Sequence, residues 1–341
     1  MFLVGIKLMG HGFQLFGSEF AETLIQATAN PLVAVSIGLL ATTILQSSST
    51  TTALIVGLVA GDALSVTSAI YMVMGANVGT TVTNSLASLA HILRKVEFRR
   101  AFAGSTVHDF FNVFAILILL PIEMLFHPIT TVATFLAGSF EGIGGFTFVS
   151  PLNIMVTPAV DFISGFAMQN PWTLIGFALV MMFTSLYLIV KIMKSLVLGK
   201  IEKFLDAYLF RTAFTAFVVG LVLTSIVQSS SVTTSIVVPL LGAGVLTIRK
   251  VFPYSIGANL GTTVTALMAS LVTGSVAALT VAFGHLVFNL FGILLIYPIK
   301  ELPIKAAEKM GEIAYNSRRT AIAYIIFAFY ILPFLVIIFL R

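Results

Sequence analysis

Gln46-Ser-Ser-Ser49 and Gly75-Ala-Asn-Val-Gly-Thr-Thr81 decide the fold of this chain, because each of these stretches occurs twice. They return as Gln228-Ser-Ser-Ser231 and Gly257-Ala-Asn-Leu-Gly-Thr-Thr263, in both cases 182 residues further on. Around them, 21 of the 46 positions from residue 38 to residue 83 are identical in the second copy without a gap. The sequence therefore contains an internal repeat, which is the first feature to establish in any chain.

The composition surrounding these motifs is typical of a membrane protein. Of the 341 residues, 58% are hydrophobic and 9% are charged, whereas a soluble domain carries about 25% charged residues. Long stretches contain no Asp, Glu, Lys or Arg, for example residues 23–61, 212–248 and 251–299. A spanning helix needs roughly 20 mainly apolar residues. We therefore predict an all-α integral membrane protein.

The basic residues predict that the two repeats have opposite orientations. In the first repeat the loop between the two motifs, residues 60–63, has no basic residue, and the loop after the second motif, residues 93–100, has four. In the second repeat the loop between the motifs carries Arg249 and Lys250, and the later loop, residues 271–274, is uncharged. Because basic loops stay in the cytoplasm, equivalent loops are expected on opposite sides of the membrane. Inverted repeats of this kind are common in secondary transporters.

This topology predicts five parts of the chain. They are an N-terminal helix with its lead-in (1–29), the first inverted repeat (30–121), an external connection with a linking helix (122–192), the second inverted repeat (193–300), and a cytoplasmic stretch with a last helix (301–341). In each repeat the Gln-Ser-Ser-Ser motif is expected at the tip of a re-entrant helical hairpin. The Gly-Ala-Asn-x-Gly-Thr-Thr motif is expected to interrupt a transmembrane helix.

The repeated motifs offer oxygen ligands at the membrane centre. Unpaired polar groups are costly in lipid, so these residues must face protein or a water-filled cavity. Hydroxyl groups donate to an anion and can also coordinate a hard cation. Freed N–H groups at a half-helix start favour an anion, and freed carbonyls at a half-helix end favour Na⁺. Small polar residues also mediate simple helix packing, but that reading is weak for two motifs duplicated at the same spacing.

Three ionisable residues outside the motifs, His108, Asp109 and His285, each allow two interpretations. His108 and His285 both precede an asparagine by four residues, which fits either interhelical hydrogen bonding or proton coupling, and we favour the hydrogen bonds. Asp109 lies in a membrane segment, where ionisable residues are functional candidates. It also lies close to Arg99 and Arg100, so a structural salt bridge is at least as good an explanation.

At these motifs the sequence resembles the type II sodium-dependent phosphate cotransporter family. The resemblance covers residues 38–300 and is strengthened by Val107-His-Asp-Phe-Phe-Asn112. It implies inorganic phosphate as substrate, Na⁺ as the coupling ion, and alternating access around a site between the halves. The chain lacks the long cytoplasmic tails and the large glycosylated external loop of animal members, so we expect a compact, bacterial-type member.

The resemblance also implies which residues bind each ligand. In the family, the serines of the paired motifs contact phosphate, which assigns to phosphate Ser47, Ser48, Ser49, Ser229, Ser230 and Ser231. Gln46 and Gln228 are expected to serve phosphate or Na⁺. The residues expected at Na⁺ are Asn77, Thr80, Asn259, Thr262 and Thr265.

Several functions are excluded or remain as alternatives. No Walker loop, Gly-x-Ser-x-Gly or His-Glu-x-x-His motif occurs, so neither an enzyme nor ATP-driven transport is supported. No cofactor and no nucleic-acid partner is expected. The alternatives are Na⁺-coupled transport of a carboxylate or sulfate, a membrane scaffold or sensor, and a channel. We expect a multi-pass protein of the cell membrane, in bacteria the inner membrane, in contact with the lipid bilayer; assembly as a homo-oligomer stays open.

Overall fold

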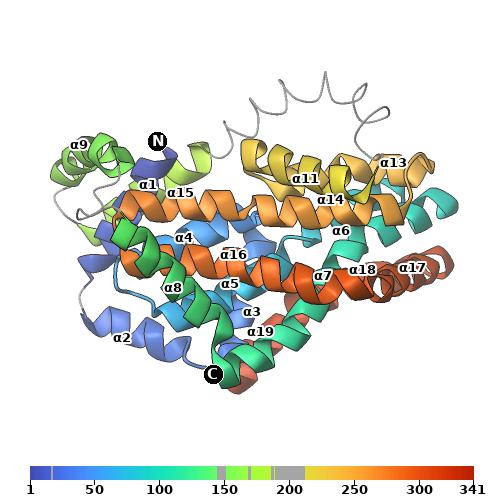
Figure 1. Ribbon diagram of the computed structural model, residues 1–341, viewed down its shortest axis with the longest axis horizontal. Coiled ribbons are helices and arrows are strands. Elements are labelled where there is room, and N and C mark those ends of the chain that lie inside the picture. Colours follow the sequence, from blue (N-terminus) through green and yellow to red (C-terminus); the bar gives the residue numbers. More distant parts are fainter. Residues whose placement is uncertain (17, 144–150, 168–169, 186–187, 189–211) are drawn as a thin grey trace.

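The computed structural model describes residues 1–16, 18–143, 151–167, 170–185, 188 and 212–341. The described residues form helices and no strands, as predicted (Figure 1). The first half contains α1 (Phe2–Gln14), α2 (Ser18–Ala27), α3 (Pro31–Leu45), α4 (Ser48–Ala60), α5 (Val66–Gly79), α6 (Val82–Ser88), α7 (Lys95–Phe126), α8 (Pro128–Ile143) and α9 (Pro151–Phe166). A further helix covers Pro171–Ser185.

The second half has a similar succession of helices. It contains α11 (Ala213–Val227), α12 (Ser230–Ser235), α13 (Val237–Ala243), α14 (Ile248–Gly261), α15 (Thr263–Thr273) and α16 (Val276–Ile296), followed by α17 (Glu301–Asn316), α18 (Arg318–Ile326) and α19 (Leu332–Leu340). Residues 189–211, which include the expected end of the linking helix and the start of the second repeat, lie outside the described part of the chain.

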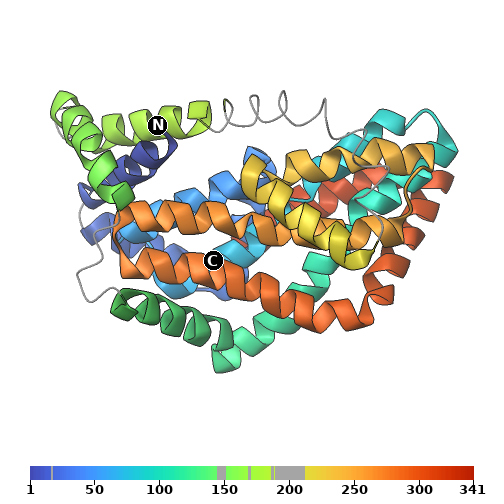
Figure 2. The ribbon, with the colours of Figure 1, turned by 45° about the horizontal axis from the view of Figure 1, so that its top comes forward.

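Several of these helices are long and apolar enough to cross a membrane. Within the described residues these helices are Lys95–Phe126, Ile248–Thr273, Val276–Ile299 and Arg318–Leu340. The end of α2 and α3 form a further candidate that is bent by 102°. Helix α15 packs against α16, and both lie along the long axis of the molecule (Figures 1 and 2). The chain is therefore a membrane-embedded helical protein.

The two Gln-Ser-Ser-Ser motifs have nearly the same backbone geometry. Gln46 ends α3 and Gln228 ends α11, both in the left-handed region, with φ of 53° and 56°. Ser47 and Ser229 follow in extended conformation and begin α4 and α12. A left-handed residue cannot continue a right-handed α-helix. One helix therefore ends at each glutamine, and a new one starts after it. Each motif thus joins two helices of 15 residues or fewer, which are too short to span a bilayer.

Glycines bring two pairs of helices into backbone contact. A Cβ atom at Gly75 would collide with the carbonyl oxygen of Val35, so α5 lies directly on α3. A Cβ atom at Gly257 would collide in the same way with the carbonyl oxygen of Phe217, which brings α14 onto α11. Both residues of the second contact lie 182 positions after those of the first. Small residues allow this close approach of membrane helices.

The interruption expected within each Gly-Ala-Asn-x-Gly-Thr-Thr motif falls on its threonines and not on its glycines. Helix α5 continues through both glycines, and the irregularity follows at Thr80 and Thr81 before α6 begins. In the second half α14 likewise continues to Gly261, and only Thr262 separates it from α15. Packing of the glycines against a neighbouring backbone offsets their low helix propensity.

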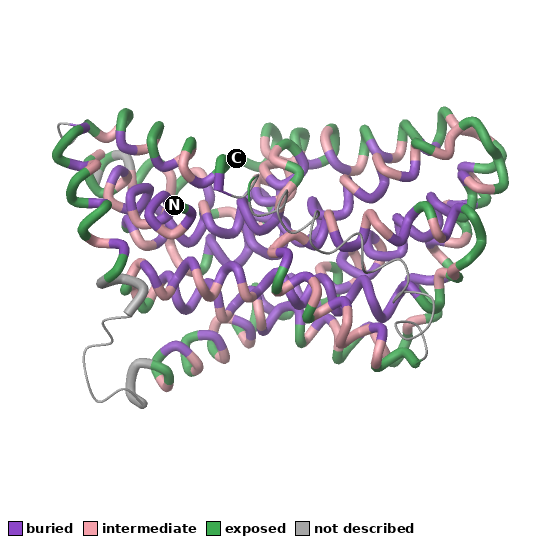
Figure 3. The backbone as a smooth tube through the Cα atoms, turned by 90° about the horizontal axis from the view of Figure 1, so that it is seen from above, coloured by how far each residue is buried: buried purple, intermediate pink, exposed green. Residues whose placement is uncertain are grey.

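Buried residues form the middle of the molecule, and exposed residues lie at its two ends and on its outer helices (Figure 3). Large exposed apolar side chains include Phe135 on α8, Leu294 on α16 and Phe339 on α19. Such exposure is unusual for a soluble protein and suits contact with lipid tails.

The two ends of the Ile248–Thr273 helix carry different groups of loops. At its start, Arg249 pairs with Glu301 of α17, and Arg318 donates to the carbonyl oxygen of Leu93, 3.0 Å away. These contacts gather the basic segments 93–100, 249–250 and 300–319 at one end. At its far end, Thr273 lines a cavity together with Ala60. The two loops without basic residues, 60–63 and 271–274, therefore lie at the other end.

Candidate functional site

The first serine of each motif caps the helix that follows it. Ser47 Oγ accepts the backbone N–H of Thr50 at 3.2 Å, and Ser229 Oγ accepts that of Val232 at 3.3 Å. Ser, Thr, Asp and Asn are the usual residues at this position, where they satisfy a free N–H group. These two hydroxyls are therefore already engaged in holding the turn.

The remaining four serines lie buried in the first turn of α4 and α12. They are Ser48, Ser49, Ser230 and Ser231, each at most 6% exposed. Within the described residues, Ser49 Oγ and Ser230 Oγ have no hydrogen-bond partner. A buried polar group without a partner is costly, and such groups in native structures often mark a ligand or water site. Each serine motif thus presents at least one buried hydroxyl without a partner among the described residues.

The two glutamines differ in their surroundings. Gln46 is exposed, whereas Gln228 is partly buried and its Nε2 lies 3.5 Å from Met268 Sδ. Neither side chain makes a recorded hydrogen bond to a serine of the motifs. Their positive φ angles give them a role in ending α3 and α11 that the sequence alone did not indicate.

Asn77 and Asn259 meet in a buried network that joins the two halves. Asn259 Nδ2 donates to Asn112 Oδ1 at 2.9 Å and to Asn289 Oδ1 at 2.7 Å. Asn77 Oδ1 lies 3.3 Å from His285 Nε2 and 3.4 Å from Asn289 Nδ2. These asparagines, which were expected at Na⁺, bond to residues of α7 and α16 in the structure. The hydrogen-bonding reading of His285 fits this arrangement.

The threonines expected at Na⁺ are mostly bonded within their own helices. Thr80 Oγ1 donates to the carbonyl oxygen of Ala76 at 3.0 Å, and Thr262 Oγ1 donates to that of Asn259 at 2.6 Å. Thr265 Oγ1 has no partner in the described part of the chain. Thr265 is thus the hydroxyl of this set without a partner, and the other two donate their protons but keep oxygen lone pairs that can coordinate a cation.

Each half's serine-motif helix packs against the other half. Helix α4 lies against α15, and α12 lies against α6. Ser231 Oγ reaches the carbonyl oxygen of Thr80 at 3.5 Å. The structure therefore places a phosphate candidate from the second half beside a Na⁺ candidate from the first half, as a shared site between the halves requires.

Asp109 is fully buried and has no basic partner among the described residues. Its Oδ2 accepts from Ser85 Oγ at 3.3 Å and from Tyr324 Oη at 3.5 Å. The salt bridge with Arg99 or Arg100 is not formed, because those side chains lie nearly three turns earlier on α7 and point to the basic end. The sequence analysis did not single out Ser85 or Tyr324, since neither lies in a repeated motif.

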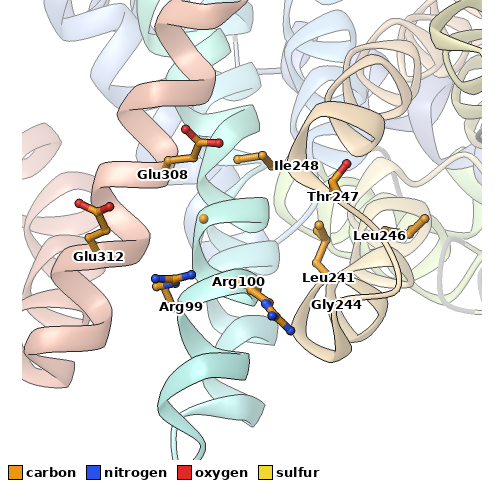
Figure 4. A pocket seen from close by; sticks show the side chains of 10 residues that line it. Arg99, Arg100, Leu241, Gly244, Leu246, Thr247, Ile248, Glu308 and Glu312 are labelled. Carbon is orange, nitrogen blue, oxygen red and sulfur yellow. The ribbon is translucent and has the colours of Figure 1, made fainter.

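Arg99 and Arg100 line a cavity of about 400 Å³ at the basic end of the molecule. Its walls come from α7, from the turn between α13 and α14, and from Glu308 and Glu312 of α17 (Figure 4). Arg249 also approaches Glu308, at 3.9 Å. This cavity is lined by charges of both signs and contains no residue of the serine motifs, so it is separate from the candidate site.

Comparisons with known proteins agree on one family. A family profile described as Na+/Pi-cotransporter matches residues 1–148 and 166–297. The human sodium-dependent phosphate transport protein 2B is 31% identical over 431 aligned residues, which cover 97% of this chain and 62% of that protein. For sheep protein 2A the identity is 31% over 418 residues, with 98% and 65% covered. The chain thus spans less than two thirds of the length of these relatives. No solved structure gave a significant match.

Proposed function

This chain belongs to the Na+/Pi-cotransporter family, and on that premise we propose that it is a symporter coupling inward Na⁺ movement to uptake of inorganic phosphate. The observation that carries the proposal is the family match, which extends over both copies of the serine motif. The relatives named above are sodium-dependent phosphate transport proteins. Neither the family nor the site gives support for an enzyme.

We infer that the two repeats are inverted and that transport proceeds by alternating access. The matched turns at Gln46 and Gln228 and the matched contacts of Gly75 and Gly257 support a structural repeat. The loops between the motifs, residues 60–63 and 244–248, border cavities at opposite ends of the molecule. In transporters with inverted repeats, the substrate binds near the bilayer midplane between the repeats.

Phosphate is proposed to bind between the two serine motifs. The serine hydroxyls would donate to phosphate oxygens, which are strong acceptors, and Ser49 and Ser230 have hydroxyls free to do so. The N-terminus of α4, where Ser48 and Ser49 lie, also favours an anion. No arginine or lysine lies in α4 or α12. Bound Na⁺ would therefore supply the positive charge that phosphate needs.

Na⁺ is proposed to bind at the oxygen-rich segments that follow Gly79 and Gly261. Hydroxyls and carbonyls are the ligands that hard cations prefer. Thr265 Oγ1 is free, and the carbonyl oxygen of Thr80 lies at the irregularity between α5 and α6. We propose the multi-pass chain to reside in the bacterial inner membrane, with the basic end in the cytoplasm.

The decisive experiment is uptake of radiolabelled phosphate into liposomes that contain the purified protein. An inward Na⁺ gradient should drive concentrative uptake, and an equal K⁺ gradient should not. Unlabelled sulfate and dicarboxylates, added in excess, test the alternative substrates, because a competitor that is carried would reduce the signal. Absence of uptake with either cation, from protein shown to be folded and inserted, would refute the proposed function.

A further inference from the structure

A hydrogen bond between two side chains ties the second serine-motif helix to the first half, in addition to the bond from Ser231 to the carbonyl oxygen of Thr80. Thr234 Oγ1 of α12 lies 2.9 Å from Asn84 Oδ1 of α6. Both residues are buried, at 2% and 3% exposure. Two uncharged polar groups in such surroundings gain from pairing, because each would otherwise be left without a partner.

The equivalent bond cannot form in the other half of the molecule. The residues 182 positions away from Asn84 and Thr234 are Ala266 and Thr52. Helix α4, which carries Thr52, packs against α15, which carries Ala266. Alanine has no polar side-chain atom, and Thr52 Oγ1 is buried without a hydrogen-bond partner in the described part of the chain. The two halves thus differ at this one crossing contact.

Thr234 is directly connected to the candidate phosphate site. Its hydroxyl also lies 2.6 Å from the carbonyl oxygen of Ser230, one helical turn earlier, so its one proton is shared between this oxygen and Asn84 Oδ1. In that same turn, Ser231 Oγ faces the carbonyl oxygen of Thr80. A contact that holds Thr234 on α6 therefore fixes the short helix on which Ser230 and Ser231 stand.

We propose that Asn84 is a positioning residue that holds Ser230 and Ser231 in register with the first half, and that the first serine motif has no such support. This inference rests on the proposed function and adds a prediction to it. The two serine motifs are alike in sequence, but only the second is held to the other half by a bond of this kind. Misplacement of the second motif weakens phosphate binding, since hydroxyl donors act only at hydrogen-bonding distance.

The test compares two identical substitutions at equivalent positions. Thr234→Val removes the partner of Asn84, whereas Thr52→Val removes a hydroxyl that has none. In the liposome assay, Thr234→Val should raise the apparent KM for phosphate about five-fold with little change in maximal rate, which corresponds to the loss of one hydrogen bond. Thr52→Val removes no side-chain bond between the halves and should raise KM less than Thr234→Val does. Thr234→Ser keeps a hydroxyl and should therefore keep the wild-type KM for phosphate.

Asn84→Ala provides the second arm of the test. Asn84→Ala should raise the apparent KM for phosphate as Thr234→Val does. The KM of the double variant should be no higher than that of either single variant, because both substitutions remove the same bond. Equal KM values for Thr52→Val and Thr234→Val would overturn the inference. So would additive effects in the double variant, or a loss of maximal rate with unchanged KM.

A cross-link separates failure of this inference from failure of the proposed function. The chain has no cysteine, so Asn84→Cys and Thr234→Cys introduce the only two thiols. Their oxidation in membranes should form a disulfide whether or not phosphate is the substrate. A wild-type protein without uptake would refute the function alone. A pair that does not cross-link would refute the contact itself.

Discussion

Substitution of Gly75 by alanine should weaken the molecule at the contact between α3 and α5. The new Cβ atom would lie less than 2.5 Å from the carbonyl oxygen of Val35, well inside the 3.0 Å below which such contacts do not occur. Both groups belong to helix backbones, so no side chain can rotate away. The two helices must separate, and overpacking of this kind costs about 1–3 kcal/mol or more.

This cost can be measured without any assumption about transport. For a chain of this size, about 1–3 kcal/mol should lower the unfolding midpoint by roughly 1–4 °C. The assay is thermal unfolding of the detergent-purified protein, followed by size-exclusion chromatography. Gly138→Ala is the matched control, because a Cβ atom at Gly138 meets nothing within 4 Å. Equal midpoints for Gly75→Ala and Gly138→Ala would show that the two backbones are not in contact.

Four further substitutions test other parts of the molecule. Ser48→Ala and Ser230→Ala should each reduce phosphate uptake about ten-fold with normal membrane insertion, if serine hydroxyls hold the anion; unchanged uptake in both would remove the site assignment. Glu123→Ala should lower the unfolding midpoint. The buried carboxylate accepts the N–H groups of Ile129 and Thr130 at the start of α8, and its loss leaves them unpaired. An unchanged midpoint would contradict this capping role. Arg249→Ala should change stability by less than about 1 kcal/mol, since its ion pair with Glu301 is half exposed, and a larger change in denaturant unfolding would argue against a surface contact.

Composition and repetition allowed much of the fold to be predicted. Apolar stretches without charge indicate membrane helices, and the structure confirms an all-helical chain. A break between two helices was expected at each Gln-Ser-Ser-Ser motif, but the left-handed glutamine that makes the break was not. The gathering of basic segments around Arg249 and Glu301 agrees with the side predicted for those loops. Family membership was recognisable for the same reason, since the repeated motifs carry it.

Contacts between distant residues could not be predicted in the same way. The glycines of the motif favour an interrupted helix. Whether a glycine interrupts its helix or packs that helix against another one depends on a neighbour such as Val35, which only the fold brings close. Asp109 looked like a partner for the nearby arginines, yet the helical turn directs it towards Ser85. Asn84 received no attention, because it stands just outside the repeated stretch and has no counterpart there.

The backbone contacts of α5 on α3 and of α14 on α11 also act as seals. Where a carbonyl oxygen touches the Cα atom of a glycine, there is no room for a water molecule, and a hydrated ion is larger still. Solutes are thereby excluded from the space within each pair. The serine-motif helices make their contacts with the other half outside these two pairs, α4 with α15 and α12 with α6.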